Sequence, residues 1–433
     1  MFTVTQKCKR GNAAPEIERD VINIYPSVEK QALIGFGGAF TEAAAYCYSK
    51  LGEKEKAEVL KKYLDKTNGA GYTIGRLHIG SCDFSLDQYS EAYSEDLSDF
   101  NIEQDKKHII PMVKDALALV GEELFLFASP WSPPAFMKDS GKLVGGGKLK
   151  KEFYPTYAQY FVKFIQAYAK EGIRISAVTV QNEPHAVQTW ESCLYTAEEE
   201  GDFAANYLRP ALDQNGLGDV KIIAWDHNRE RIVDRAMESF AVDGARDAFW
   251  GLGYHWYSGD HFDAVDAFRA LYPEKEIFET EFCHEIDVDN FDDDKRNMDY
   301  AVEYISSLYH GSSAVCDWNL ILDDKKGGPY HCRTMTGCAA AFYCDLQTGA
   351  LVEDGIYRII QTITSKISRG DKVVLTTRAS QALKEVAVKK QNGEIWLFVL
   401  NTSDEEQTVN VRMDGSVAAF NLSPNTLSAN LIV

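Results

Sequence analysis

The sequence lacks any segment that would direct the chain to or through a membrane. Its 433 residues contain no run of about eighteen apolar residues, the length that a membrane-spanning helix requires. The first ten residues, MFTVTQKCKR, lack the apolar stretch of a secretory signal peptide. We therefore expect no stable membrane insertion and a cytoplasmic location.

Positive charge is scarce. The chain has 45 Lys and Arg residues against 65 Asp and Glu residues, which gives a formal net charge of −20 at pH 7. Proteins bind nucleic acid through clustered basic side chains, and anionic membrane surfaces attract basic segments. The charge balance therefore argues against both partners and favours a neutral or cationic ligand.

Metal signatures are also missing. The nine cysteines are an odd number, and no two have the close spacing of a zinc site, since Cys332, Cys338 and Cys344 are too far apart. Free thiols in a reducing compartment are therefore expected. His185 and His284 each follow a glutamate of interest, but no third ligand is evident. We expect no metal site.

The chain does contain a repeated alternation of strands and helices. Apolar, β-branched runs predict eight strands, at 32–36, 72–77, 124–128, 177–180, 221–224, 252–256, 277–282 and 313–318. Helical patterns follow them at 41–66, 105–119, 155–171, 197–214, 229–241, 262–271, 294–309 and 356–367. Eight such units over roughly 340 residues predict a (β/α)8 barrel. The alternative is an open, doubly wound sheet, but Gly35-Phe-Gly-Gly38 lacks the G-x-G-x-x-G spacing that would favour it.

Both ends of the chain follow a different pattern. Short alternating segments at 372–377, 385–390, 394–400, 408–412 and 416–421 predict an all-β module. Near the start, residues 21–25 predict a short strand that ends at Pro26. About sixty residues are few for an independent core. We expect residues 1–28 and 372–433 to form a β-sandwich that packs on a catalytic barrel of residues 29–371.

One stretch, residues 177–184, leaves a carboxylate at the end of a core strand. Pro184 cannot donate to a sheet ladder, so the strand ends before it and leaves Asn182 and Glu183 at its carboxyl end. In a parallel barrel this end carries the catalytic residues. Cleavage of a glycosidic bond requires two carboxyl groups, one to protonate the leaving oxygen and one to attack or to activate water. Glu183 therefore needs a partner.

The seventh predicted strand offers that partner. Glu279 and Glu281 should share one face, because side chains alternate along a strand. Glu281 lies nearer the barrel mouth and is the better nucleophile, whereas Glu279 would lie deeper, with Arg76 as a possible partner. A solvated carboxylate or a loop cap explains a single strand-end Glu equally well. Two of them, on the fourth and seventh strands, favour a catalytic pair.

Other polar and aromatic side chains also fall at predicted strand ends, with few cations among them. This composition suits a neutral, polyhydroxylated substrate, since flat apolar rings cover C–H surfaces and polar groups bind hydroxyls. His255 could equally be a buried core histidine, and the tryptophans could be barrel plugs. The candidates at these ends are Asp83, Trp131, Asn182, His255, Tyr257 and Trp318.

At these residues the chain resembles glycoside hydrolase family 30, the group that includes lysosomal glucosylceramidase and bacterial β-glycosidases. The resemblance implies a (β/α)8 barrel with a β-sandwich from both chain ends. It also implies that Glu183 is the acid/base and Glu281 the nucleophile, that Tyr257 hydrogen-bonds the nucleophile, and that no cofactor is needed. Asp83, Trp131, Asn182 and Trp318 would contact the sugar, and His255 and Tyr257 would lie at the wall. The matching stretches are GFGGAFTEAAA at 35–45, SCDFS at 81–85, ASPWSP at 128–133, AVTVQNEP at 177–184, HWY at 255–257, ETEFC at 279–283 and DWNL at 317–320.

The resemblance implies a retaining, exo-acting glycosidase for a neutral β-linked glycoside or short glycan, with β-glucosides expected first. Such a mechanism places the two carboxyl groups about 5–5.5 Å apart, with Glu183 protonated near neutral pH and Glu281 ionised. β-Xylosidase, β-fucosidase and β-1,6-glucanase activities of the same family are alternatives. Further alternatives are a carbohydrate-binding protein without activity and a metal-dependent hydrolase. Neither a signal peptide nor disulfides are evident, unlike in the lysosomal members.

Overall fold

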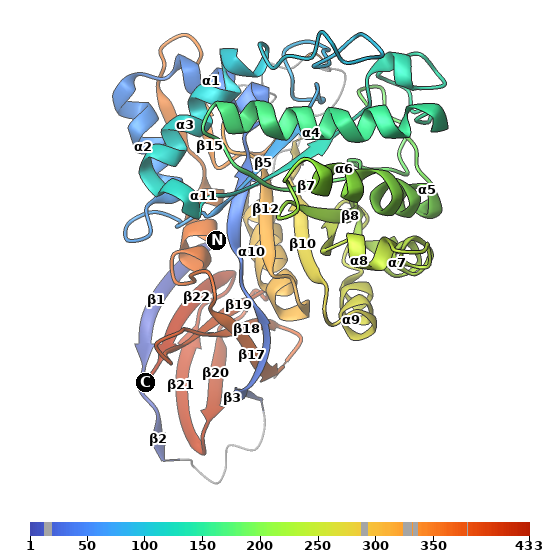
Figure 1. Ribbon diagram of the computed structural model, residues 1–433. Coiled ribbons are helices and arrows are strands. Elements are labelled where there is room, and N and C mark those ends of the chain that lie inside the picture. Colours follow the sequence, from blue (N-terminus) through green and yellow to red (C-terminus); the bar gives the residue numbers. More distant parts are fainter. Residues whose placement is uncertain (13–19, 287–292, 324–330, 332–336, 379) are drawn as a thin grey trace.

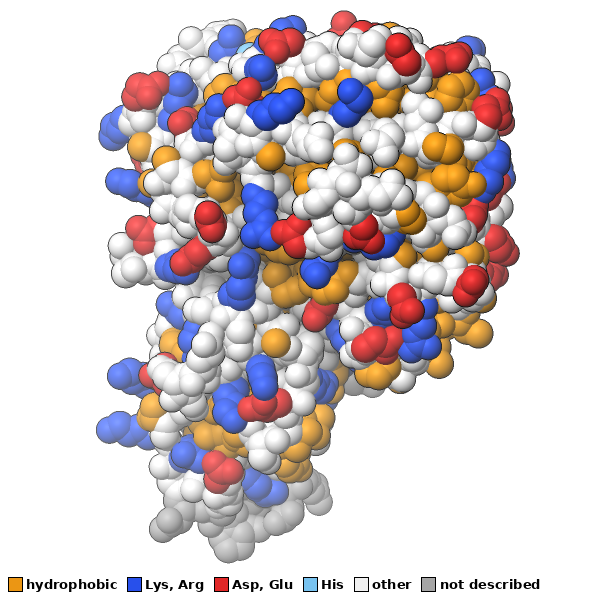
Figure 2. Space-filling model, in the orientation of Figure 1, with side chains coloured by type: hydrophobic (Ala, Val, Ile, Leu, Met, Phe, Trp, Pro, Cys, Tyr) orange, Lys and Arg blue, Asp and Glu red, His pale blue; other side chains and the backbone are white. Residues whose placement is uncertain are grey.

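The computed structural model describes residues 1–12, 20–286, 293–323, 331, 337–378 and 380–433. A barrel ringed by helices forms the larger part of the molecule, and an all-β domain extends below it (Figure 1). Both chain termini lie at the all-β domain. On the face shown in Figure 2, acidic and basic side chains are interspersed. No helix in the described ranges is long and apolar enough to cross a membrane.

Eight parallel strands close into a barrel, which confirms the predicted (β/α)8 fold. Apolar side chains from these strands, including Phe127, Ile223 and Phe278, fill the interior. The first barrel strand begins three residues later than predicted, because residues up to Ala32 belong to a strand of the other domain. In chain order the barrel strands are β4 (Gly35–Ala39), β5 (Ile74–Ile79), β6 (Phe125–Pro130), β7 (Ile175–Thr179), β8 (Lys221–Asn228), β9 (Gly251–His255), β10 (Glu276–Glu281) and β12 (Ala314–Asn319).

Helices follow the barrel strands, with two departures from the predicted pattern. The predicted helix at 41–66 is broken at Leu51 and Gly52, whose backbones are extended, and the Thr41 side chain caps its start. The predicted helix at 197–214 contains a π-helical turn at 204–208, just before Pro210, which lacks the N–H of a regular turn. The helices are α1 (Glu42–Lys50), α2 (Glu53–Leu64), α3 (Ile109–Val120), α4 (Tyr154–Lys170), α5 (Ala197–Phe203), α6 (Arg209–Gln214), α7 (Ile232–Phe240), α8 (Ala245–Ala248), α9 (Phe262–Leu271), α10 (Asp293–His310) and α11 (Gly355–Thr364).

A nine-stranded sheet forms the all-β domain from both ends of the chain, as predicted. Its core includes Ile22, Val374, Leu397 and Val409. The exact domain boundaries stay a prediction. The strands are β1 (Phe2–Cys8), β2 (Gly11–Asn12), β3 (Val21–Ala32), β17 (Lys372–Thr377), β18 (Leu383–Lys389), β19 (Ile395–Asn401), β20 (Gln407–Met413), β21 (Ser416–Leu422) and β22 (Thr426–Ile432).

The predicted end of β3 at Pro26 is wrong. The strand continues to Ala32, and its pairing with β17 jumps from Tyr25 opposite Leu375 to Glu29 opposite Val374. Residues 26–28 therefore form a bulge, where a residue without an N–H group breaks no ladder hydrogen bond.

Two small sheets cover the region beyond the barrel strands. One pairs β11 (Glu285–Ile286) with β14 (Gly337–Cys338), and the other contains β13 (Leu322–Asp323), β15 (Phe342–Cys344) and β16 (Leu351–Glu353). The first of these sheets contributes directly to the pocket described next.

Candidate active site

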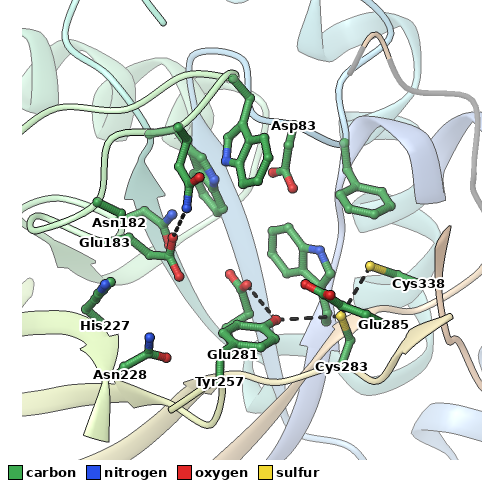
Figure 3. A pocket seen from close by; sticks show the side chains of 16 residues that line it. Asp83, Asn182, Glu183, His227, Asn228, Tyr257, Glu281, Cys283, Glu285 and Cys338 are labelled. Carbon is green, nitrogen blue, oxygen red and sulfur yellow. Dashed lines mark hydrogen bonds between the residues drawn. The ribbon is translucent and has the colours of Figure 1, made fainter. Parts of the chain in front are cut away.

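A cavity of about 370 Å³ lies at the carboxyl ends of the barrel strands (Figure 3). It brings together all the predicted site residues except His255, which is buried and hydrogen-bonded to Glu183. The lining residues are Asp83, Phe84, Trp131, Asn182, Glu183, Ala186, Gln188, Trp190, His227, Asn228, Tyr257, Glu281, Cys283, Glu285, Trp318 and Cys338.

Glu183 follows β7 in a backbone conformation that side chains rarely adopt. Its φ is 49°, and Trp225 and Asp226 at the end of β8 have φ values of 69° and 56°. Non-glycine residues at such angles are strained and persist only where the surrounding structure holds them. Here the Glu183 N–H group donates to the Asp226 carbonyl at 2.9 Å, which ties the two strained segments together. The backbone conformation of Glu183 is therefore held by the end of the neighbouring strand.

Glu281, the last residue of β10, is held at both carboxylate oxygens. Arg76 of β5 donates from Nη1 to Oε2, and Tyr257 donates its hydroxyl to Oε1 at 2.9 Å. The Arg76 guanidinium is fully buried, with its centre 4.8 Å from the Trp131 ring and 5.3 Å from the Trp318 ring. The carboxylate is therefore fixed in one orientation toward the pocket, and the predicted contact with Tyr257 is present.

Asp226 organises the floor of the site, and the sequence patterns did not single it out. Its side chain is fully buried. Burial raises its pKa, but Arg76 and then His255 outweigh burial and lower the pKa below its usual range. The only signal for this role in the sequence was the position of Asp226 at a predicted strand end. It accepts hydrogen bonds from Arg76 at 3.0 Å, Ser129 at 2.9 Å, Thr179 at 2.7 Å and His255 at 3.0 Å.

Glu183 and His255 share a hydrogen bond of 3.3 Å. Burial lowers the pKa of His255, but the negative charges of Glu281, Asp226 and Glu183 outweigh burial and raise it to about 9. Burial raises the pKa of Glu183, but the hydrogen bond from His255 outweighs burial and lowers it overall. These opposite shifts place the shared proton on His255. This corrects the expectation that Glu183 itself holds a proton near neutral pH.

Asp83 presents an unpartnered oxygen to the pocket. Its Oδ1 atom is buried and has no hydrogen-bond partner among the described residues. Burial raises the pKa of Asp83 well above its usual value, and the charges of Glu281, Glu191 and Glu183 raise it further. Buried polar groups normally find a partner, so this oxygen fits a ligand hydroxyl.

Two stacked indoles form an aromatic wall beside Asp83. The Trp131 and Trp318 ring centroids are 5.4 Å apart with 26° between the planes, and Phe84 packs edge-on against Trp318. The Asn182 side-chain oxygen accepts from Arg76 at 2.8 Å, which directs the amide NH2 group away from Arg76. Apolar faces beside polar groups are the composition of a sugar-binding site.

Glu279 does not share a face with Glu281, and Arg76 is not its partner. Two residues of β10 oppose one residue of β9 between these positions, so the alternation is broken by a bulge. The Glu279 side chain instead accepts from Ser307 of α10 at 2.7 Å. Burial, and then the nearby Glu303 carboxyl, raise its pKa well above the usual value. Glu281 is therefore the strand's pocket carboxylate.

Cys8, Cys82, Cys193, Cys283, Cys316 and Cys338 are free thiols; Cys332 lies outside the described ranges. No group of three or more His, Cys, Asp or Glu side chains among the described residues is arranged to hold a metal ion.

Comparisons with known proteins agree with the barrel fold. The family model described as the glycosyl hydrolase family 30 TIM-barrel domain matches residues 33–347. Putative glucosylceramidase 3 of Caenorhabditis elegans is 36% identical over 346 residues, which are 75% of this chain but just under two thirds, 65%, of that relative. Lysosomal acid glucosylceramidase of Mus musculus is 31% identical over 409 residues, 89% of this chain and 78% of that protein. The crystal structure of SrfJ from Salmonella typhimurium matches with a TM-score of 0.92 at 34% identity, covering 96% of this chain and 93% of that one. The resemblance seen in the motifs is thus confirmed, and the chain belongs to glycosyl hydrolase family 30.

Proposed function

We propose that this chain is a retaining, exo-acting β-glycosidase that hydrolyses β-glucosides. The observation that carries the proposal is the pair of glutamates in one pocket with different partners. Glu281 is bound by a guanidinium and a phenol, whereas Glu183 is bound by an imidazole that holds a proton. The names of the two glucosylceramidase relatives support glucose as the sugar.

The two carboxyl groups divide the reaction. The Glu281 carboxylate attacks the anomeric carbon, the bond from that carbon to the leaving oxygen breaks, and Glu183 protonates that oxygen. Glu183 then removes a proton from water, which attacks the anomeric carbon and releases Glu281. The two inversions together retain the anomeric configuration.

His255 supplies the proton that Glu183 passes on. The charge of Glu281 is the largest of the influences that raise the pKa of His255 against burial. As Glu281 forms its ester bond, this charge disappears, the pKa of His255 falls, and the proton moves from Nδ1 through Glu183 to the leaving oxygen. When Glu281 is released, its charge returns, and the proton taken from water goes back to His255. Proton transfer between His255 and Glu183 is thus coupled to the formation and cleavage of the Glu281 ester.

The sugar occupies the space between the aromatic wall and the two glutamates. One ring face packs on Trp131 and Trp318, a hydroxyl donates to or accepts from Asp83, and the Asn182 NH2 group donates to the 2-hydroxyl. The last contact strengthens as charge develops at the neighbouring anomeric carbon.

A panel of aryl β-glycosides tests the proposal. The β-glucoside should have a higher kcat/KM than the β-xyloside, β-fucoside and β-galactoside, and NMR of the first product should show the β-anomer. Release of the α-anomer would contradict retention. A larger kcat/KM for the glycoside of another sugar would identify that sugar, instead of glucose, as the substrate. Absence of turnover on every substrate, β-1,6-linked glucan included, would favour a carbohydrate-binding protein. Glu281→Gln, which should have no measurable turnover, controls for contaminating activity.

A further inference from the structure

Two thiols meet in the wall of the pocket. Cys283 follows Glu281 by two residues, on the segment that leads from β10 into β11, and Cys338 is the last residue of β14. The antiparallel pairing of β11 and β14 places Glu285 opposite Cys338, and the Ala339 N–H group donates to the His284 carbonyl at 2.9 Å. The two cysteines are thus brought together by backbone pairing between segments 55 residues apart.

The two sulfur atoms are in direct contact. The Cys283 thiol donates to the Cys338 sulfur at 3.3 Å, and the Cys283 sulfur lies 3.6 Å from the Tyr257 hydroxyl (Figure 3). Both side chains line the cavity, with 2% of Cys283 and 8% of Cys338 exposed. A small molecule in the pocket therefore meets Cys338 more readily than Cys283.

We propose that Cys283 and Cys338 are a dithiol site in the catalytic pocket that forms a reversible disulfide with small organic disulfides as the oxidant. The site stands on the contact between the sulfurs and on their access from the cavity. The effect on turnover described below rests on the proposed glycosidase function.

The oxidation is an ordinary thiol–disulfide exchange. The Cys338 thiolate attacks one sulfur of the oxidant R–S–S–R, a mixed disulfide forms, and R–S⁻ leaves and takes up a proton. The Cys283 sulfur then attacks the Cys338 sulfur, loses its proton to solvent, and expels the second R–S⁻. Two cysteine thiols are oxidised and one disulfide is reduced to two thiols. The hydrogen bond to Cys338 and then burial raise the pKa of Cys283 well above the usual value, which leaves the first attack to Cys338.

Disulfide formation must disturb the nucleophile. A disulfide bond is about 2.05 Å long, so the sulfurs have to approach by about 1.2 Å from 3.3 Å. This movement changes the contact between Cys283 and the Tyr257 hydroxyl, which is the donor to Glu281. Because displacements of about 1 Å can reduce turnover by up to about a hundredfold, we expect kcat to fall by roughly tenfold.

The test uses the full chain and bis(2-hydroxyethyl) disulfide. After treatment, remaining thiols are alkylated, and a non-reducing digest is analysed by mass spectrometry. We expect the peptides of Cys283 and Cys338 to be joined with the loss of two hydrogens, and dithiothreitol to separate them and restore kcat. Cys338→Ser should form no such bond and should keep its own untreated activity, whereas Cys283→Ser should stop at a mixed disulfide on Cys338. Cys332→Ser, the matched control close to Cys338 in sequence, should form the bond as the wild type does.

In the wild type, stable mixed disulfides without the joined peptides, or a bond from Cys338 to Cys332, would overturn the proposal. A joined pair with unchanged kcat would refute the link to Tyr257 and Glu281. The mass measurement needs no substrate, so failure of the dithiol site and failure of the proposed glycosidase function give different results.

Discussion

Replacing Asp226 by Asn removes a negative charge from the floor of the site while keeping the shape of the side chain. Asp226 is fully buried and binds Arg76 and His255. The substitution therefore weakens the hold on the His255 proton without removing a group that touches the substrate. Asp226 is a positioning residue, so the informative quantity is the pH dependence of activity rather than its absolute level.

The size of the effect follows from the hydrogen bond between Asp226 and His255. A hydrogen bond to a charged group contributes about 1.5–3 kcal/mol, against about 0.5–1.5 kcal/mol for a neutral one. A loss of about 1.4 kcal/mol of interaction with the protonated form of a group lowers its pKa by one unit. The pKa of His255, about 9 in the wild type, should therefore fall by about one unit. Because the first step requires this proton, the basic limb of the kcat/KM profile should move by the same amount toward acid pH.

The assay is the kcat/KM profile from about pH 4 to pH 10 for Asp226→Asn, wild type and a matched control. Ser129→Ala serves as the control because it removes one neutral donor to Asp226 but leaves the charge. Its basic limb should move by much less. Circular dichroism checks that each variant is folded. An unshifted basic limb in folded Asp226→Asn would refute the placement of the proton on His255.

Three further predictions concern the glutamates. In Glu183→Ala, azide should rescue the turnover of a dinitrophenyl glycoside and give the β-azide, whereas Glu281→Ala should give the α-azide; NMR identifies the anomer, and the opposite pair would reverse the two roles. A crystal structure should place the carboxyl groups of Glu183 and Glu281 about 5–5.5 Å apart, and a separation of about 6.5–9.5 Å would indicate inversion. Glu279→Gln should leave kcat within about twofold, since this carboxyl lies outside the pocket. The pKa of Glu279 is higher in the folded state than in the unfolded state, where it is near 4.5. As the pH rises above 4.5, ionisation of Glu279 therefore increasingly favours the unfolded state. Urea unfolding at pH 8 should therefore show Glu279→Gln to be at least as stable as the wild type; a large loss of stability would contradict a neutral Glu279.

The parts of the site that sequence patterns predicted are those set by local chemistry. Pro184 cannot donate to a sheet ladder, and β7 ends ahead of it at Thr179, so the residue pattern alone is enough to place Glu183 at the barrel mouth. The bulge between Glu279 and Glu281 depends instead on pairing with β9, and alternation along one strand cannot reveal it. The same holds for the bulge at Pro26, which arises from pairing with β17.

Asp226 was missed for a related reason. In the sequence it is one of several acids at predicted strand ends. Its importance comes from donors on β5, β6, β7 and β9, which only the closed barrel brings to one point. The sequence also could not show that His255 carries the proton it shares with Glu183, because this depends on how close His255 lies to three carboxylates at once. Roles that arise from convergence of distant strands require the fold.

The stacked pair of Trp131 and Trp318 gives the protein a built-in optical reporter. Indole emission depends on the polarity and solvation of the ring, and these two rings line the cavity. A sugar that binds in the cavity changes the polarity around these rings and so changes the emission of two of the seven tryptophans. Occupancy of the pocket can therefore be followed by intrinsic fluorescence in a variant that cannot turn over, without any chromogenic leaving group.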